Sequence, residues 1–235
     1  MSKSLDGFQV ALFFDQSTSF NVEQLCESVL GTLPDSTERQ KATGVTIATI
    51  TEEQVQVRFV LNPIRCDIHF TPQPEPGPDF PPKSAVPMEE LYAFARKVCS
   101  KAAGYFGTIQ RIGIVVAQVE RYPSAAAALT ALKKSLPFEF GVSPASEDVI
   151  VQYNVRRSVQ TSTGPFEINQ LHNKSTGQAQ TFQFGPDGAH ANVFMVFRES
   201  LDVNTTAAGL KLTGVKLNAV VDILFKQVSS QLPGQ

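Results

Sequence analysis

The order of apolar and polar positions divides the first half of this chain into strand-like and helix-like segments. Apolar residues recur at every second position, the period of a half-buried strand, at 55–61 and 64–70, and a further strand is predicted at 45–50. Two further segments, 7–14 and 111–119, are apolar on both phases. This pattern predicts strands covered on both faces, with 111–119 near the centre of a sheet.

Apolar residues spaced three or four positions apart predict helices at 21–33 and 88–106. Pro34 ends the first helix, and Pro87 suits the first residue of the second. A short helix follows a Ser124 cap and ends before Pro137. A last helix is predicted at 210–232.

The second half of the chain returns to strand patterns. The predicted strands are 149–157, 166–172, 179–184 and 191–198, with turns at 173–177 and 185–188. Together these patterns predict an α+β protein. Residues 7–122 read β-α-β-β-β-α-β, a ferredoxin-like arrangement with one extra strand. The rest reads as a second antiparallel sheet layer with a C-terminal covering helix, so that 1–140 and 141–235 form two halves packed as one unit.

A proline-rich segment at 71–87 separates the early strands from the long helix. It holds seven of the fifteen prolines. Each proline fixes φ and lacks a backbone donor, so this segment lies in neither the middle of a sheet nor a helix. We predict an extended crossover.

The amino-acid composition argues against some classes of function. Of the 235 residues, 42% are apolar and 18% are charged, below the roughly 25% usual in soluble domains. Seventeen Phe residues and no Trp suggest a well-packed interior with apolar surface left for a partner. A net charge of −2 argues against a dedicated DNA-binding protein. The chain shows neither an apolar run of about 18 residues nor a secretion signal, which predicts a cytoplasmic protein without membrane contact.

The three cysteines, Cys26, Cys66 and Cys99, each fall on the apolar phase of a separate segment. They are therefore predicted to be buried free thiols rather than metal ligands or a disulfide.

Three segments together resemble a known family. They are Arg111-Ile-Gly-Ile114, the late strand at 193–203 with Asp202, and the closing helix at 216–232 with Phe225. In their order they resemble a sporadically distributed bacterial family of uncharacterised proteins of about 250 residues. The resemblance implies an accessory gene, of the kind found in defence or toxin-linked systems, and no particular reaction.

Asp67 and His69 lie two positions apart on a predicted strand and share a face with Arg65, while Arg58 projects from the neighbouring strand. Such a set suits a metal site or an acid–base pair in a metal-dependent enzyme. A solvated face with cross-strand ion pairs explains the same pattern, and no third ligand stands at useful spacing. We favour the ion pairs and expect no metal and no cofactor.

A second hypothesis is binding of RNA or another single-stranded nucleic acid on a basic sheet face. The candidate residues are Arg58, Arg65, Arg156 and Arg157.

The favoured prediction is a non-catalytic subunit that binds itself or another protein. No catalytic residues are assigned, because no set of titratable residues converges in the sequence. Candidate contact residues are aromatic side chains in loops or off the apolar phase, namely Phe13, Phe80, Phe138 and Phe140. Ordinary packing beneath a loop is the alternative for each of them.

Overall fold

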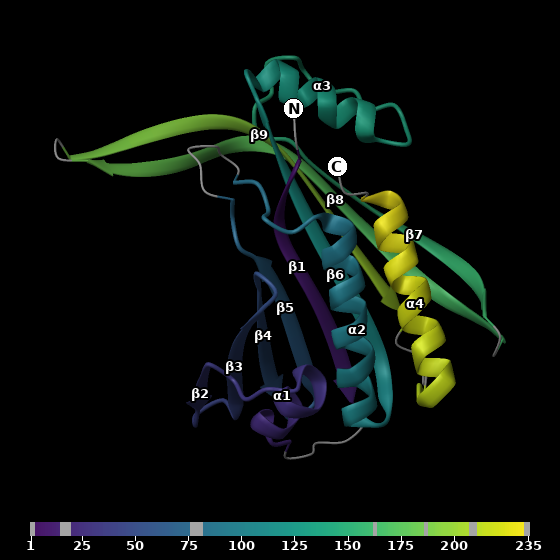
Figure 1. Ribbon diagram of the computed structural model, residues 1–235. Helices are drawn as coiled ribbons and strands as arrows, with labels where there is room; N and C mark the ends of the chain where they lie inside the picture. The colour runs from purple at the N-terminus through teal and green to yellow at the C-terminus, as the bar shows by residue number, and fades with distance from the viewer. Residues whose placement is uncertain are drawn as a thin grey trace.

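The computed structural model describes residues 3–14, 20–75, 82–161, 164–185, 188–206 and 211–232. Within this part of the chain, nine strands form one antiparallel sheet (Figure 1). The strands are β1 (Ser4–Phe14), β2 (Ser36–Gln40), β3 (Val45–Glu52), β4 (Val55–Asn62), β5 (Arg65–Pro72), β6 (Ile109–Tyr122), β7 (Ile150–Thr161), β8 (Gly164–Gly185) and β9 (Gly188–Thr205).

Four helices accompany the sheet over the same residues. They are α1 (Val22–Leu30), α2 (Met88–Phe106), α3 (Ala125–Ser135) and α4 (Gly214–Gln231). The Asn21 side chain caps α1 by accepting from the backbone N–H groups of Glu23 and Gln24, and Gly31 ends it with φ of 80°. Along the described residues, no helix combines the length and apolarity that a membrane crossing requires.

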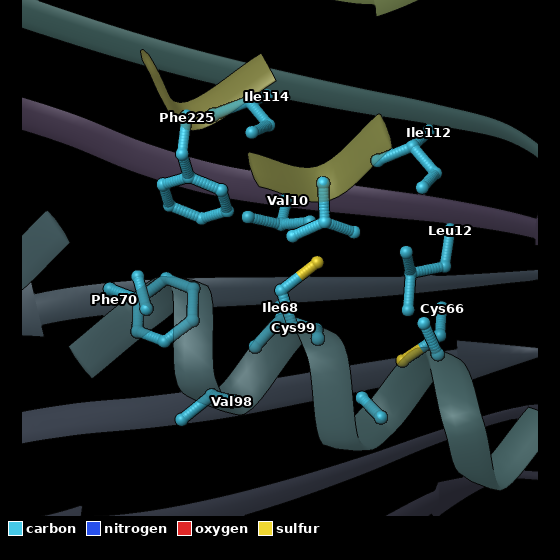
Figure 2. Packing of buried hydrophobic residues seen from close by; sticks show 14 of the residues in the cluster. Val10, Leu12, Cys66, Ile68, Phe70, Val98, Cys99, Ile112, Ile114 and Phe225 are labelled. Carbon is cyan, nitrogen blue, oxygen red and sulfur yellow. The ribbon is translucent and has the colours of Figure 1, made fainter. Parts of the chain in front are cut away.

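The main hydrophobic core lies between the sheet and three of these helices, α1, α2 and α4. Figure 2 shows strand residues such as Leu12, Ile68 and Ile112 facing the apolar stripe of α2, which includes Val98 and Cys99. Each of these strand residues is fully buried. The apolar residues that recur with the helix period of 3.6 and those that recur with the strand period of 2 therefore pack against each other in one core.

The strand order corrects part of the predicted topology. The order is β2-β3-β4-β5-β1-β6-β9-β8-β7, and every neighbouring pair is antiparallel. The α+β class is confirmed, but the ferredoxin-like arrangement is not, because a split βαβ unit requires parallel strands joined by a helix. The predicted second sheet layer is also wrong, since β9 pairs with β6 and brings β7 and β8 into the same sheet.

One strand, β8, differs from its predicted bounds, and another, β2, was not predicted. Residues 173–177, predicted as a turn, continue β8 because they pair with β7 or β9 on either side. Pairing on both edges satisfies the backbone groups that a turn would leave to solvent. The sequence pattern missed β2, in which every residue is polar and exposed and which adds one short strand beyond β3.

The proline-rich segment returns close to its starting point. Pro74 bridges Ser84, and the Glu75 N–H donates to the Lys83 carbonyl at 2.8 Å. The segment therefore leaves the end of β5 and comes back beside it before α2 begins. Phe80 lies outside the described residues.

The three thiols are buried and free, as predicted. Burial raises the pKa of Cys26 to about 11 and that of Cys99 to about 12. Burial also raises the pKa of Cys66 well above its usual value. These thiols are packing residues, because a thiol reacts as its thiolate.

We expect Phe59→Ala to lower the free energy of unfolding by about 3–5 kcal/mol, because Phe59 is fully buried and its loss leaves a cavity. Urea unfolding followed by circular dichroism measures the change. Leu33→Ala is the matched control: Leu33 is 63% exposed, and its removal should change the free energy by less than about 0.5 kcal/mol. Equal effects of the two substitutions would contradict the assignment of the core.

Candidate functional site

All four helices of the described chain pack on the same face of the sheet. Phe197, which contacts the α3 cluster, lies on the same side of β9 as Leu201, which belongs to the main core. The opposite face carries no helix among the described residues, and we call it the open face. The central position of β6 in the sheet is confirmed. Its second face is covered in part, since Val119 is buried with Ala179 and Val196 on the open face while Val115 is half-buried.

Two arginines flank an aromatic ring on the open face. Phe13 of β1 stands opposite Arg65 of β5 and Arg111 of β6. The guanidinium carbons of Arg65 and Arg111 lie 4.8 Å and 5.4 Å from the ring centroid, within cation–π range. The predicted contact residue Phe13 and the predicted basic residue Arg65 thus form one unit, together with Arg111, which the sequence analysis did not single out as a basic residue.

Asp67 lies beside this unit and is already engaged. Its Oδ1 accepts from Gln9 at 2.6 Å and from the Nε and Nη2 of Arg65 at 2.8 Å and 2.6 Å. His69 stands opposite Arg58 on β4, as the predicted shared face requires. Burial lowers the pKa of His69. The negative charge of Asp67 opposes burial with a smaller effect, and the positive charges of Arg58 and Arg65 lower the pKa further.

This arrangement favours the ion-pair interpretation over a metal site. No group of three or more His, Cys, Asp or Glu residues lies close enough to hold a metal ion within the described ranges. The three hydrogen bonds that Oδ1 of Asp67 accepts occupy the lone pairs with which this oxygen would bind a metal ion.

Two polar atoms of the open face are buried but have no hydrogen-bond partner within the described chain. They are Nε of Arg111 and Oδ1 of Asn169. Asn169 faces Asn204, which in turn faces Gly113, so these residues form a row across β8, β9 and β6. An unsatisfied buried polar atom costs about 1–3 kcal/mol, and the burial of both atoms keeps them out of reach of a molecule that contacts the surface.

The other two arginines of the predicted basic face lie elsewhere. Arg156 and Arg157 belong to β7 at the far edge of the sheet, five strand spacings from β5, or about 24 Å. Arg156 stands opposite Asn169 and shares the open face, whereas Arg157 stands opposite Ile168 on the helix side. The four arginines therefore form two separate pairs.

The two described aromatic residues after α3 differ in exposure. Phe138 is 45% exposed and meets Tyr153 edge to face at 5.5 Å. Phe140 is partly buried against the α3 cluster. The role of both residues in a contact stays a prediction.

A cluster of buried charges on the helix side escaped the sequence analysis. The Lys174 ammonium pairs with Oε1 of Glu199, and Lys3 reaches Oε2 of the same carboxylate at 3.3 Å. Beside them, the rings of Tyr153 and His172 stack at 4.5 Å. All but Lys3 line a cavity of about 260 Å³ between the ends of α3 and α4.

The cluster fixes α3 to the sheet. Lys174 also donates to the Ser135 carbonyl at 2.8 Å, at the last residue of α3, where a positive charge suits the helix dipole. Burial lowers the pKa of His172 and, with the nearby Glu199, raises that of Tyr153. Both side chains therefore favour their neutral forms, and the only carboxylate of the cluster is held by two ammonium groups.

A sequence signal for this cluster existed. On β8 the apolar phase of Phe166 and Ile168 continues into His172 and Lys174, and on β9 Glu199 stands between Phe197 and Leu201. Charged residues on the buried phase of two strands are a reason to expect an internal ion pair.

No protein-family model matches this chain, and neither a curated protein nor a solved structure matches it. The resemblance to a sporadically distributed bacterial family stays a prediction.

We expect Glu199→Gln to lower the free energy of unfolding by about 3–5 kcal/mol, because it leaves the buried Lys174 ammonium without a counter-charge. Chemical unfolding measures the change. Adding Lys174→Met to this variant should recover part of the loss, since the uncompensated charge is then gone.

Asp222→Asn is the control, because its ion pair with Arg96 is exposed (58% and 55%), against 11% and 6% for Glu199 and Lys174. Its effect should stay within about 1 kcal/mol. If Glu199→Gln costs no more than Asp222→Asn, the buried pair does not anchor α3.

Proposed function

We propose that this protein is a non-catalytic protein-binding or assembly subunit and that the open face is its contact surface. The observation that carries the proposal is the one-sided distribution of the helices. A large sheet face without a helix leaves half-buried apolar residues, such as Val60, Val115 and Leu171, between charged and amide side chains. Mixed surfaces of this kind, with an apolar centre and a polar surround, are typical of protein contacts.

The β8–β9 ribbon gives independent support. From the Ala179–Phe194 pair outward, the two strands pair only with each other, because β6 reaches no further than Met195 and β7 no further than Ser175. Figure 1 shows this green ribbon extending away from the sheet. A two-stranded ribbon is only marginally stable alone in water, so a contact with another molecule would stabilise it.

The described titratable groups favour binding over catalysis. Asp67 is engaged with Arg65 and Gln9, Glu199 is held by two lysines, and burial raises the pKa of the thiols. None of these groups is poised as a nucleophile or a general base. Membership of an accessory, defence-type bacterial system is part of the proposal that rests on the resemblance alone.

A second candidate function follows from the Arg65–Phe13–Arg111 unit. Aromatic rings and arginines on an antiparallel sheet can stack and neutralise a single-stranded nucleic acid. Arg58 adds a third positive charge on the same face, two strands from Phe13.

We expect Val115→Glu to disrupt the proposed contact, because it places a charge at the centre of the open face. If the partner is a second copy, sedimentation of the wild-type protein should give a mass above 25.6 kDa that the variant loses. Val215→Glu is the control, since Val215 is 75% exposed on α4, on the covered side of the sheet.

If the wild-type protein sediments as a single chain, the partner is another protein. A photoreactive phenylalanine at position 115 should then capture it in cells, while the same group at 215 should not. Adducts at 215 as frequent as those at 115 would refute the open face as the contact surface.

The nucleic-acid candidate makes a separate prediction about salt. The affinity for single-stranded RNA, measured at low salt, should fall steeply as salt rises. Arg111→Ala should lower the affinity at low salt. It should also make the dependence on salt less steep, by about one released counterion for a lost phosphate contact. Fluorescence anisotropy measures both effects, with Arg157→Ala, on the helix side, as the control. The absence of binding at low salt removes this candidate.

A further inference from the structure

The two edges of the sheet differ sharply. At one edge, β2 has five residues, all of them polar and exposed, which is a common protection against unwanted strand pairing. At the other edge, β7 has twelve residues and contains neither Pro nor Gly. Within the described chain no strand pairs with its outer side. The backbone donors and acceptors on that side form a template about 40 Å long.

The side chains of β7 differ between its two faces. On the helix side, Tyr153, Val155 and Val159 are only half-buried, so the apolar layer continues to the edge of the sheet. On the open face, Gln152, Asn154, Arg156, Ser158 and Gln160 are exposed and polar. A strand added beside β7 would therefore need apolar residues at alternate positions, facing the helix side.

Two positive charges stand at the middle of this edge. Arg156 and Arg157 are consecutive and exposed, one on each face of the sheet. Neither guanidinium forms an ion pair with a carboxylate anywhere in the described ranges. A strand with two consecutive acidic residues would place one carboxylate beside each of them.

The same charges disfavour a second copy of β7 as the occupant. In an antiparallel pair, residues directly opposite each other lie on the same face. A two-fold axis near the middle of β7 would therefore place Arg156 directly opposite or diagonal to its own copy. Like charges in these positions destabilise a strand pair, so charge complementarity selects a different, acidic strand.

We propose that the outer edge of β7 is a strand-addition site for an extended segment of a partner protein. That segment carries two consecutive acidic residues beside Arg156 and Arg157 and alternating apolar residues toward the helix side. The inference rests on the proposed function as a protein-binding subunit, but it concerns the sheet edge and not the open face.

The test uses the full chain and a twelve-residue peptide, the length of β7, that alternates Val and Thr and carries Glu-Glu at its centre. An otherwise identical peptide carries Lys-Lys. Fluorescence anisotropy should show the Glu-Glu peptide binding at least about tenfold more tightly, a difference of about 1.4 kcal/mol. Hydrogen exchange should slow in residues 150–161 when it binds, because strand addition uses backbone N–H groups.

Charge reversal supplies the decisive variants. Arg156→Glu combined with Arg157→Glu should invert the preference, so that the Lys-Lys peptide binds more tightly. Arg39→Glu combined with Lys41→Glu makes the same change in charge at the β2 edge, and it should leave the preference as in the wild-type protein.

Three results would overturn the inference: equal binding of both peptides, protection confined to residues outside β7, or a two-fold dimer formed through β7. The Val115→Glu variant separates this inference from the open-face proposal, because it should bind the Glu-Glu peptide normally. Peptide binding without any open-face contact refutes the open face alone. An open-face contact without peptide binding refutes the β7 site alone.

Discussion

The pairing of β6 with β1 on one side and β9 on the other is the constraint on which the rest of the structure depends. Through these two ladders the early strands and the late strands become a single sheet. Ile112, Ile114 and Val116 of β6 are fully buried beneath the helices. They belong to one hydrophobic core that contains residues from both halves of the chain. Because β6 forms backbone hydrogen bonds with a strand on each side, few of its N–H and C=O groups need water as a partner.

Because the described helices all lie on one face, the sheet presents two surfaces on which the proposed contacts rest. The open face offers the Arg65–Phe13–Arg111 unit and half-buried apolar residues. The β7 edge offers backbone groups beside two arginines. The helices bury the apolar residues of the covered face, while the outer side of β7 keeps backbone groups that pair with no described strand.

The buried charges have a different role. Lys174 and Glu199 lie on the covered face and hold the end of α3, a short helix with its own small core around Leu129 and Leu132. A buried ion pair adds little net stability compared with apolar packing, but it disfavours alternative placements of its partners. Here it fixes α3 over β8 and β9 without closing the cavity beside Tyr153 and His172.

Local periodicity predicted the α+β class, most helices and strands, the buried thiols and the shared face of Arg65, Asp67 and His69, because it sets which side chains lie together. The strand order, the continuous β8, and the distance of Arg156 and Arg157 from Arg58 and Arg65 follow from the strand pairing. It also decided that Arg111 joins Phe13 and that Lys174 meets Glu199. These results depend on which strands pair across long separations in the chain. Single segments show that Lys174 and Glu199 lie on a buried phase, but not that the two residues stand opposite each other.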